Sequence, residues 1–344
     1  MNKYSKKTNL NVKTMKKILS AAFLAVIFTA SAQQPAQKAE QITNRYAMKL
    51  SRNDDGSYSL INEKRYAKIL DLSEIEDLLV PYTYKRDRLQ TQDYRGVEVR
   101  EFVYTTHKGY ELRIAVDMAE SDRPTPVVFY CHGGGWARGN NGVYRTLSQY
   151  MAKQKGVTGV RIAYSLAPQP GADVRVSIAD VLAAVQYVRD HARELNIDPS
   201  RMGFVGSSAG AHLAAVGAMR TPEAKAFVGY SGIYDLETAA ICQRSKDEQR
   251  IAYFCNRDPE ILREASPASI VPSGHVPAAQ LFCGTGDITV EYTQSEKFAE
   301  ALRKRGGKVD LQVYPGYDHN LSNKASDKME EIFFKSVDFL TANL

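Results

Sequence analysis

The chain has 344 residues, of which 44% are hydrophobic and 24% are charged. This composition is ordinary for a globular protein, and it excludes the collagen-like, disulfide-scaffold and wholly disordered classes. The formal net charge of +6, from 45 basic and 39 acidic residues, would by itself suggest a nucleic acid or an anionic membrane as partner.

The basic excess lies entirely in the first 32 residues, which have the pattern of a secretory signal peptide. Residues 1–32 hold six lysines and no acid, and the apolar run from Ile18 to Ala30 is followed by Ser31 and Ala32. The run is too short for a membrane span, which needs roughly 20 apolar residues. Cleavage after Ala32 would leave 39 basic and 39 acidic residues. We therefore expect an exported protein, periplasmic or secreted, with no stable membrane insertion and no nucleic-acid partner.

Residues 33–95 are polar and carry no chemical motif. Asp54, Asp55 and Gly56 predict a turn, and the spacing of Ser73 and Glu76 predicts a capping box that opens a short helix. We interpret this segment as an N-terminal extension of unassigned role, which precedes a main domain at residues 96–344.

The main domain begins with two alternating stretches and continues with apolar runs. Val97 to Thr106 and Tyr110 to Met118 predict an antiparallel hairpin. Unbroken apolar strands bracketed by helices then indicate an α/β fold with a mostly parallel sheet and helices on both faces. The apolar runs are Pro126–Cys131, Val157–Tyr164, Met202–Val205, Ala226–Tyr230, Ala278–Cys283 and Val309–Tyr314, and the helical stretches lie around 142–154, 177–195, 209–219, 292–305 and 326–342.

The longest interruption, at about residues 236–275, has no clear period, and we interpret it as a short lid inserted between two strands. It contains Cys242 and Cys255, 13 residues apart, and a disulfide here would close a surface loop and stabilise it by about 3 kcal/mol in the chain-entropy model. The sequence favours that bridge. Cys131 and Cys283 end apolar runs and are expected to be buried free thiols. No cysteine or histidine cluster has metal-ligand spacing, so no metal is expected.

A Gly-x-Ser-x-Gly motif lies between a predicted strand and a predicted helix. It spans residues 206–210, and the preceding residues MGFV and the following AHLAAVGAM supply the strand and the helix. Glycines at the two ends allow a sharp turn that leaves the hydroxyl of Ser208 exposed above the sheet. Ser208 is the candidate nucleophile.

The sequence HGGGW at residues 132–136 follows another apolar run directly. Three glycines can present backbone N–H groups without interference from side chains, and the tetrahedral intermediate of acyl transfer needs such donors for its oxyanion. The alternative interpretations are a glycine-rich turn and a phosphate loop. No nucleotide-binding glycine motif is present.

A serine nucleophile needs a base, and the base needs an acid that orients it. His319 follows the last apolar run on a loop, and Asp287 stands just past the preceding run, so we expect Ser208, Asp287 and His319 at the carboxyl ends of three different strands. Asp318 is a rival acid, but as the direct neighbour of His319 it is poorly placed to reach the ring, and we expect it to be solvated. The other histidines are interpreted as surface residues (His107, His191), a support of the glycine run (His132), an inward-pointing helix residue (His212) and the end of the lid (His275).

These motifs resemble the α/β-hydrolase superfamily over roughly residues 97–344. The resemblance rests on HGGGW, on YSLAP at residues 164–168, on GSSAGAH, on CGTGD and on the late His319. It is greatest for the branch of hormone-sensitive-lipase-like carboxylesterases and secreted acetyl xylan or feruloyl esterases. It implies a triad of Ser208, Asp287 and His319, and an oxyanion hole formed by the N–H groups of Gly134, Gly135 and Ala209. Ser207 and Ala211 depart from the usual lipase-like pattern, which has an acid and a glycine at these positions.

From this resemblance we expect an exported serine esterase that acts on short-acyl esters of a small molecule or oligosaccharide and needs no cofactor. Acetylated or feruloylated carbohydrate is the expected substrate. HGGGW also resembles arylformamidases, so an amide hydrolase of the same fold, peptidase or arylformamidase-like, stays open, as does a non-catalytic glycan-binding homologue. Trp136 is a candidate substrate contact or a core residue.

Overall fold

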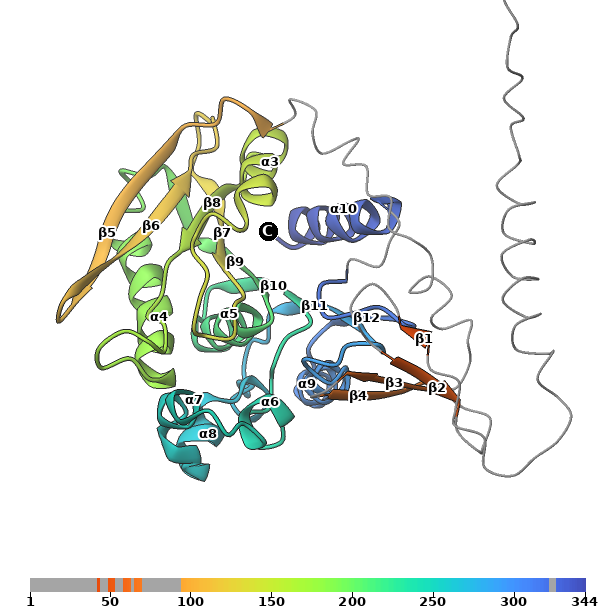
Figure 1. The fold of residues 1–344 in the computed structure, drawn as a ribbon. Helices are drawn as coiled ribbons and strands as arrows, with labels where there is room; N and C mark the ends of the chain where they lie inside the picture. Colours follow the sequence, from red (N-terminus) through yellow and green to blue (C-terminus); the bar gives the residue numbers. More distant parts are fainter. Residues whose placement is uncertain (1–41, 44–48, 53–57, 63–64, 70–93, 322–325) are drawn as a thin grey trace, which may run out of the picture. The chain divides into compact units, whose positions relative to one another are not determined.

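The computed structural model describes residues 42–43, 49–52, 58–62, 65–69, 94–321 and 326–344 (Figure 1). The predicted signal peptide, the predicted turn at 54–56 and the predicted helix from Ser73 lie outside the described residues. Within the described part of the chain, no helix is both long enough and apolar enough to cross a membrane.

An eight-stranded sheet forms the centre of the main domain (Figure 1). Its strands are β5 (Val99–His107), β6 (Tyr110–Asp117), β7 (Thr125–Cys131), β8 (Thr158–Ile162), β9 (Ile197–Ser207), β10 (Ala224–Tyr230), β11 (Ala278–Gly284) and β12 (Val309–Tyr314). Their order is β12-β11-β10-β9-β7-β8-β6-β5. The pairs β5–β6 and β6–β8 are antiparallel, and the other pairs are parallel. The predicted hairpin and the predicted mostly parallel sheet are both confirmed.

Helices cover both faces of this sheet. They are α3 (Arg145–Lys155), α4 (Val174–Asp190), α5 (Ala209–Arg220), α9 (Thr293–Lys304) and α10 (Ser326–Asn343). The alternation along β7 separates two cores: Val127 and Phe129 pack with side chains of α4, α5 and α9, whereas Val128 and Tyr130 pack with those of α3 and α10. A strand buried on both faces is continuously apolar, which is why the sequence showed unbroken runs.

The ends of α4 differ from the sequence prediction. Asp173 is its N-cap, because its Oδ1 accepts the N–H groups of Arg175 at 2.8 Å and Val176 at 3.0 Å, so the helix begins before residue 177. It ends at Asp190, and the turn that follows closes at Asn196, whose φ of 50° is left-handed. Apolar periodicity locates a helix, but capping decides where it starts and stops.

Residues 236–275, the segment between β10 and β11, hold several short helices; we call it the insertion. They are α6 (Ala240–Gln243), α7 (Glu248–Tyr253), α8 (Pro259–Ala265) and the 3-10 turns η3 (Cys255–Arg257) and η4 (Pro267–Ser269). The longest of them has seven residues.

The disulfide predicted between Cys242 and Cys255 is wrong, since the structure holds both residues as free thiols. Cys242 is 1% exposed and belongs to the hydrophobic core, whereas Cys255 is half-buried. Burial raises the pKa of both thiols. Cys131 and Cys283 are buried free thiols, as expected.

A second sheet lies within the N-terminal extension, where the sequence showed no motif. Its strands are β1 (Ile42–Thr43), β2 (Lys49–Arg52), β3 (Tyr58–Asn62) and β4 (Arg65–Ile69), and they pair antiparallel in that order. Strands of two to five residues are too short to show a clear alternation of polarity.

Candidate active site

Ser208 lies at the sharp turn between β9 and α5. Its backbone is left-handed with a φ of 54°, and its N–H donates to the carbonyl oxygen of Tyr230 at 2.8 Å. A Cβ added to Gly206 would lie 2.2 Å from the carbonyl oxygen of Gly210, and one added to Gly210 would lie 2.1 Å from that of Cys131. Both positions therefore exclude a side chain, and the motif folds as the predicted strand–turn–helix.

The structure brings Ser208, Asp287 and His319 together. Nδ1 of His319 is 2.7 Å from Oδ2 of Asp287, and Nε2 of His319 is 2.9 Å from Oγ of Ser208. Because a carboxylate only accepts hydrogen bonds, Nδ1 carries the hydrogen, and the lone pair of Nε2 faces the serine hydroxyl. The side chain of Asp287 is 1% exposed and that of His319 is 20% exposed, so the base is reachable from outside and the acid is not.

Backbone contacts hold the acid and the base in place. Oδ1 of Asp287 accepts the N–H groups of Thr289 at 2.7 Å and Val290 at 2.9 Å, which leaves Oδ2 for the imidazole. The two loops also touch directly, since a Cβ added to Gly284 would lie 2.1 Å from the carbonyl oxygen of Tyr317. The carboxyl ends of β11 and β12 are therefore fixed against one another.

Asp318, the rival acid, does not pair with the imidazole through its described contacts. Its Oδ1 accepts the N–H of Asn320 at 3.0 Å, and its carbonyl accepts the N–H of Leu321 at 3.0 Å. The residue is only 7% exposed, so the expectation that Asp318 is solvated is wrong. It shapes the loop that presents His319.

The glycine run follows β7 and lies against the nucleophile. A Cβ added to Gly133 would be 3.4 Å from Cβ of Ser208. Gly134 and Gly135 have φ values of 126° and 63°, and in the described part of the chain their N–H groups donate to no protein atom. Ala209 is the first residue of α5, so its N–H has no acceptor within the helix. Three free N–H groups thus belong to residues next to Ser208 or to the loop that lies against it.

His132 holds the start of this run, as the sequence predicted. It is 2% exposed, its Nδ1 lies 2.8 Å from the carbonyl oxygen of Gly133, and its ring stacks on Tyr164 with centroids 4.3 Å apart. The hydroxyl of Tyr164 donates to the carbonyl oxygen of His132 at 2.6 Å. Burial lowers the pKa of His132, and a neutral ring suits this apolar position.

Trp136 is a core residue, and its assignment as a substrate contact is wrong for this structure. The side chain is fully buried, with an exposed fraction of 0%. Its Nε1–H donates to Nδ1 of His212 at 3.2 Å, and its ring packs edge-to-face on Phe254 with centroids 4.9 Å apart. The Trp therefore attaches the glycine run to α5 and to the insertion.

His212 is fully buried and extends this connection to the end of α8. Its Nε2 lies 2.8 Å from the carbonyl oxygen of Ala265, at the end of α8. Since Nδ1 accepts from Trp136, Nε2 must carry the hydrogen, and the ring is neutral. Burial lowers the pKa of His212 to about 4. The sequence predicted that His212 points inward, but nothing in it showed the partners, which come from two distant segments.

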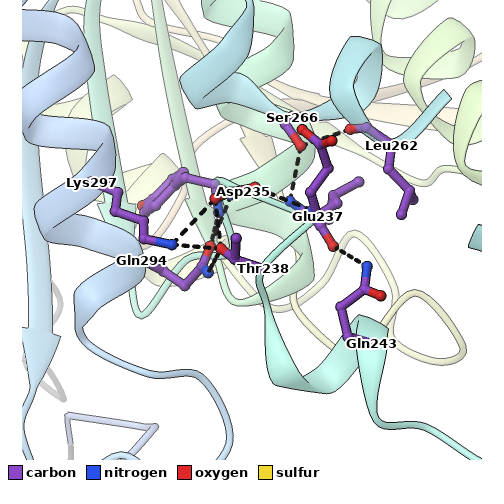
Figure 2. A network of polar contacts seen from close by, with 10 residues as sticks. Asp235, Glu237, Thr238, Gln243, Leu262, Ser266, Gln294 and Lys297 are labelled. Atoms are coloured by element: carbon purple, nitrogen blue, oxygen red, sulfur yellow. Dashed lines mark hydrogen bonds and ion pairs between the residues drawn. The ribbon is translucent and has the colours of Figure 1, made fainter. Parts of the chain in front are cut away.

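Figure 2 shows the polar contacts that join the two ends of the insertion to each other and to α9. The N–H of Leu236 donates to Oγ of Ser266 at 2.9 Å, which ties the start of the segment to its far end. Oε1 of Gln294, on α9, accepts the N–H groups of Tyr234 at 3.0 Å and Asp235 at 2.8 Å. Tyr234 and Asp235 directly precede the insertion, and Nε2 of Gln294 also donates to Oγ1 of Thr238 inside it at 3.3 Å. The insertion is therefore fastened to α9 as well as to α5.

The remaining histidines have structural contacts. Nε2 of His107 lies 2.6 Å from Oδ1 of the buried Asp180, which corrects the prediction of a solvated surface residue. Nδ1 of His191 lies 2.8 Å from the carbonyl oxygen of Tyr187, and Nε2 of His275 lies 2.8 Å from that of Ala224. Among the residues that the structure describes, no group of three or more metal-ligating side chains is suited to hold a metal ion.

Comparison with known proteins identifies the family. The BD-FAE family model matches residues 113–302, more than half of the chain. A probable isoprenylcysteine alpha-carbonyl methylesterase of Arabidopsis thaliana is 27% identical over 222 residues, which cover 58% of this chain and 46% of that protein. An acetyl esterase of Salmonella schwarzengrund is 26% identical over 230 residues, which cover 58% of this chain and 67% of that protein. The chain spans about half the length of the plant relative.

Solved structures agree with this assignment. An esterase of Thermogutta terrifontis, Est2 with bound butyrate, superposes with a TM-score of 0.61 and 25% identity over 72% of this chain and 95% of its own. The chain therefore belongs to the BD-FAE family, in the hormone-sensitive-lipase-like carboxylesterase branch of the α/β-hydrolase superfamily.

Proposed function

We propose that this protein is an exported serine esterase that hydrolyses short-acyl carboxylic esters through Ser208, His319 and Asp287. The observation that carries the proposal is the continuous hydrogen-bond path from Asp287 through the imidazole to the serine hydroxyl, with links of 2.7 and 2.9 Å. A serine hydroxyl becomes nucleophilic when a neighbouring base takes its proton, and these distances allow that transfer.

In the proposed reaction, Oγ of Ser208 attacks the ester carbonyl carbon while Nε2 of His319 accepts the hydroxyl proton. Asp287 holds the ring in the required tautomer and stabilises its charged form. The negative charge on the carbonyl oxygen is bound by the N–H groups of Gly134, Gly135 and Ala209, and losing one such donor typically costs roughly 3–4 kcal/mol in the barrier.

The intermediate then collapses. The bond between the acyl carbon and the alcohol oxygen breaks, and the alcohol leaves with the proton from His319. Water, deprotonated by the same imidazole, attacks the acyl-enzyme and releases the acid and the free serine. The proton taken from Ser208 leaves with the alcohol, and the attacking water returns a proton to the serine, so the proposed cycle balances without a cofactor or a metal.

Short acyl groups are supported by two observations. The longest helix of the insertion has seven residues, which offers little apolar surface to a long chain. The names of similar proteins include an acetyl esterase and an esterase with bound butyrate or propionate. Acetylated or feruloylated carbohydrate is the proposed substrate, and export through residues 1–32 would bring the enzyme to it.

A fluorophosphonate probe tests the nucleophile. We expect it to label the wild type and not Ser208→Ala, whose kcat should fall on the order of 10⁶-fold with the fold intact. Absence of labelling in folded wild-type protein would favour a non-catalytic binding protein instead.

A substrate panel then tests the reaction class. It compares p-nitrophenyl esters of graded acyl length, acetylated xylan, N-formylkynurenine and aminoacyl anilides. We expect acetyl to butyryl esters to give the highest kcat/KM. A higher kcat/KM on either amide than on every ester would overturn the proposal in favour of an amide hydrolase.

A further inference from the structure

We infer that Arg250, on α7 of the insertion, forms a carboxylate-binding subsite beside the oxyanion loop, so that the preferred esters carry a negative charge a few bonds from the scissile bond. This inference rests on the proposed function and names a substrate class for it.

The position of Arg250 follows from the packing of α7. Residues three and four positions apart share a face of a helix, and the residues after Arg250 at these spacings are Tyr253 and Phe254. Both lie against Trp136, with ring centroids 6.2 and 4.9 Å from its centroid. The same face of α7 therefore places Arg250 over the residue that precedes the tryptophan.

That residue is Gly135. A Cβ added to it would lie 3.6 Å from Nη2 of Arg250. At the other end of the same loop, a Cβ added to Gly133 would lie 3.4 Å from Cβ of Ser208. Two residues of chain span at most about 7 Å, so the guanidinium and the nucleophile flank one short loop. A carboxylate a few bonds away from the ester carbonyl can bridge that distance.

The guanidinium is unusual because it is half-buried and has no partner. Within the described ranges, no carboxylate or carbonyl oxygen lies within hydrogen-bond distance of it. Arg257, in the same insertion, instead donates to the carbonyl oxygen of Cys242 at 3.1 Å. A partly buried cation without a partner is less stable than a paired one, and a guanidinium is suited to bind a carboxylate through two parallel hydrogen bonds.

A small cavity opens between the loop and α7. Gly135, Arg250 and Tyr253 line it together with Asp247, and its volume is about 10 Å³, which is room for one water molecule or one carboxylate oxygen. Asp247 is the acid that lines this cavity, but it caps α7: its Oδ1 accepts the N–H of Gln249 at 3.0 Å. It forms no ion pair with Arg250 in this structure.

Matched esters test the subsite on both sides of the scissile bond. For the acyl side, monoethyl succinate, glutarate and adipate are compared with the same ethyl esters bearing an amide in place of the carboxylate. For the alcohol side, 4-acetoxybenzoate is compared with 4-acetoxybenzamide. The measured quantity is the ratio of kcat/KM for the charged ester to that for its neutral partner.

We expect a ratio of roughly 10 or more for at least one pair in the wild type, a ratio near 1 in Arg250→Gln, and an intermediate ratio in Arg250→Lys, which keeps the charge without the planar fork. Arg263→Gln is the control, because Arg263 is an exposed residue of α8; it should keep the wild-type rates and ratio.

A wild-type ratio near 1 for every pair, or a raised ratio that survives in folded Arg250→Gln, would overturn the inference while ester hydrolysis still supported the proposed function. If the wild type hydrolyses no ester, charged or neutral, and Ser208 takes no fluorophosphonate, the proposed function itself fails and the subsite with it.

Discussion

The carboxyl ends of the strands, the carboxyl edge of the sheet, hold Ser208, Asp287 and His319. The insertion at residues 236–275 packs on the neighbouring glycine run, and different interactions hold the two regions. At the edge, backbone N–H groups supply the hydrogen bonds. That of Ser208 donates to the carbonyl oxygen of Tyr230, and those of Thr289 and Val290 donate to the carboxylate of Asp287. In the insertion, side chains from distant elements supply the hydrogen bonds. Gln294 donates to Thr238 in the insertion and accepts the N–H groups of the two residues that precede it, and His212 donates to the carbonyl oxygen of Ala265.

This difference predicts that the two regions respond differently to substitution. The edge contacts are made by backbone groups and glycines, even between strands that are distant in the sequence, so most side-chain substitutions elsewhere leave them in place. The insertion depends on a few buried polar groups, and each one that loses its partner costs about 1–3 kcal/mol. The following substitutions test the backbone contacts of the edge and the side-chain contacts of the insertion separately.

The largest expected effect is on catalysis at the edge, from Asp287→Asn. The amide can donate to the imidazole and favour the wrong tautomer while occupying the same space, so we expect kcat to fall on the order of 10⁴-fold. Steady-state rates on p-nitrophenyl acetate and a melting curve measure it. A loss of less than tenfold in folded protein would show that another acid, such as Asp318, supports His319.

The next largest effect is a loss of stability, expected from Gly210→Ala at the carboxyl edge. The new Cβ would lie 2.1 Å from the backbone oxygen of Cys131, so we expect the free energy of unfolding to fall by at least about 3 kcal/mol. The matched control is Gly274→Ala in the insertion, where a Cβ would meet nothing within 4 Å, and urea melts should show a change within about 0.5 kcal/mol. Equal effects of the two substitutions would contradict the close packing of the turn between β9 and α5.

The buried His212, which bonds to the insertion, predicts that the free energy of unfolding depends on pH. The pKa of His212 is about 4 in the folded protein, against about 6.5 in the unfolded chain. Between these values the unfolded state binds more protons, so stability is present above pH 6.5 and is lost as the pH falls toward 4, by up to roughly 3 kcal/mol. In His212→Gln this loss should be absent. Urea melts at pH 7.0 and 4.5 compare the variants, and parallel losses in both would contradict the assignment.

The smallest effect is expected from Gln294→Ala, which leaves the N–H groups of Tyr234 and Asp235 without their acceptor. We expect the free energy of unfolding to fall by about 2 kcal/mol and amide hydrogen exchange to quicken in residues 236–275. Thr293→Ala is the control, since Thr293 is exposed at the start of the same helix. Unchanged exchange in the insertion would show that its other contacts, such as those of Lys297 with Thr238 and of His212 with Ala265, anchor it without Gln294.

By itself, the sequence determined the sheet and the residues at its edge. Strands buried on both faces must be continuously apolar, and a sharp turn between strand and helix needs glycines, so the runs and the Gly-x-Ser-x-Gly motif marked β7, β9 and the place of Ser208. Chain order then placed Asp287 and His319 at neighbouring strand ends. These signals are local, because each depends only on residues near it in the chain.

The tertiary structure decided which side chains from distant segments are buried together or paired. It buried Trp136 under the insertion, paired His107 with Asp180, enclosed Asp318 and kept Cys242 apart from Cys255. It also placed Arg250 above Gly135. Residue types do not reveal these outcomes, because the partners lie on segments that are distant from one another in the sequence, and the sequence of each segment is compatible with many other neighbours.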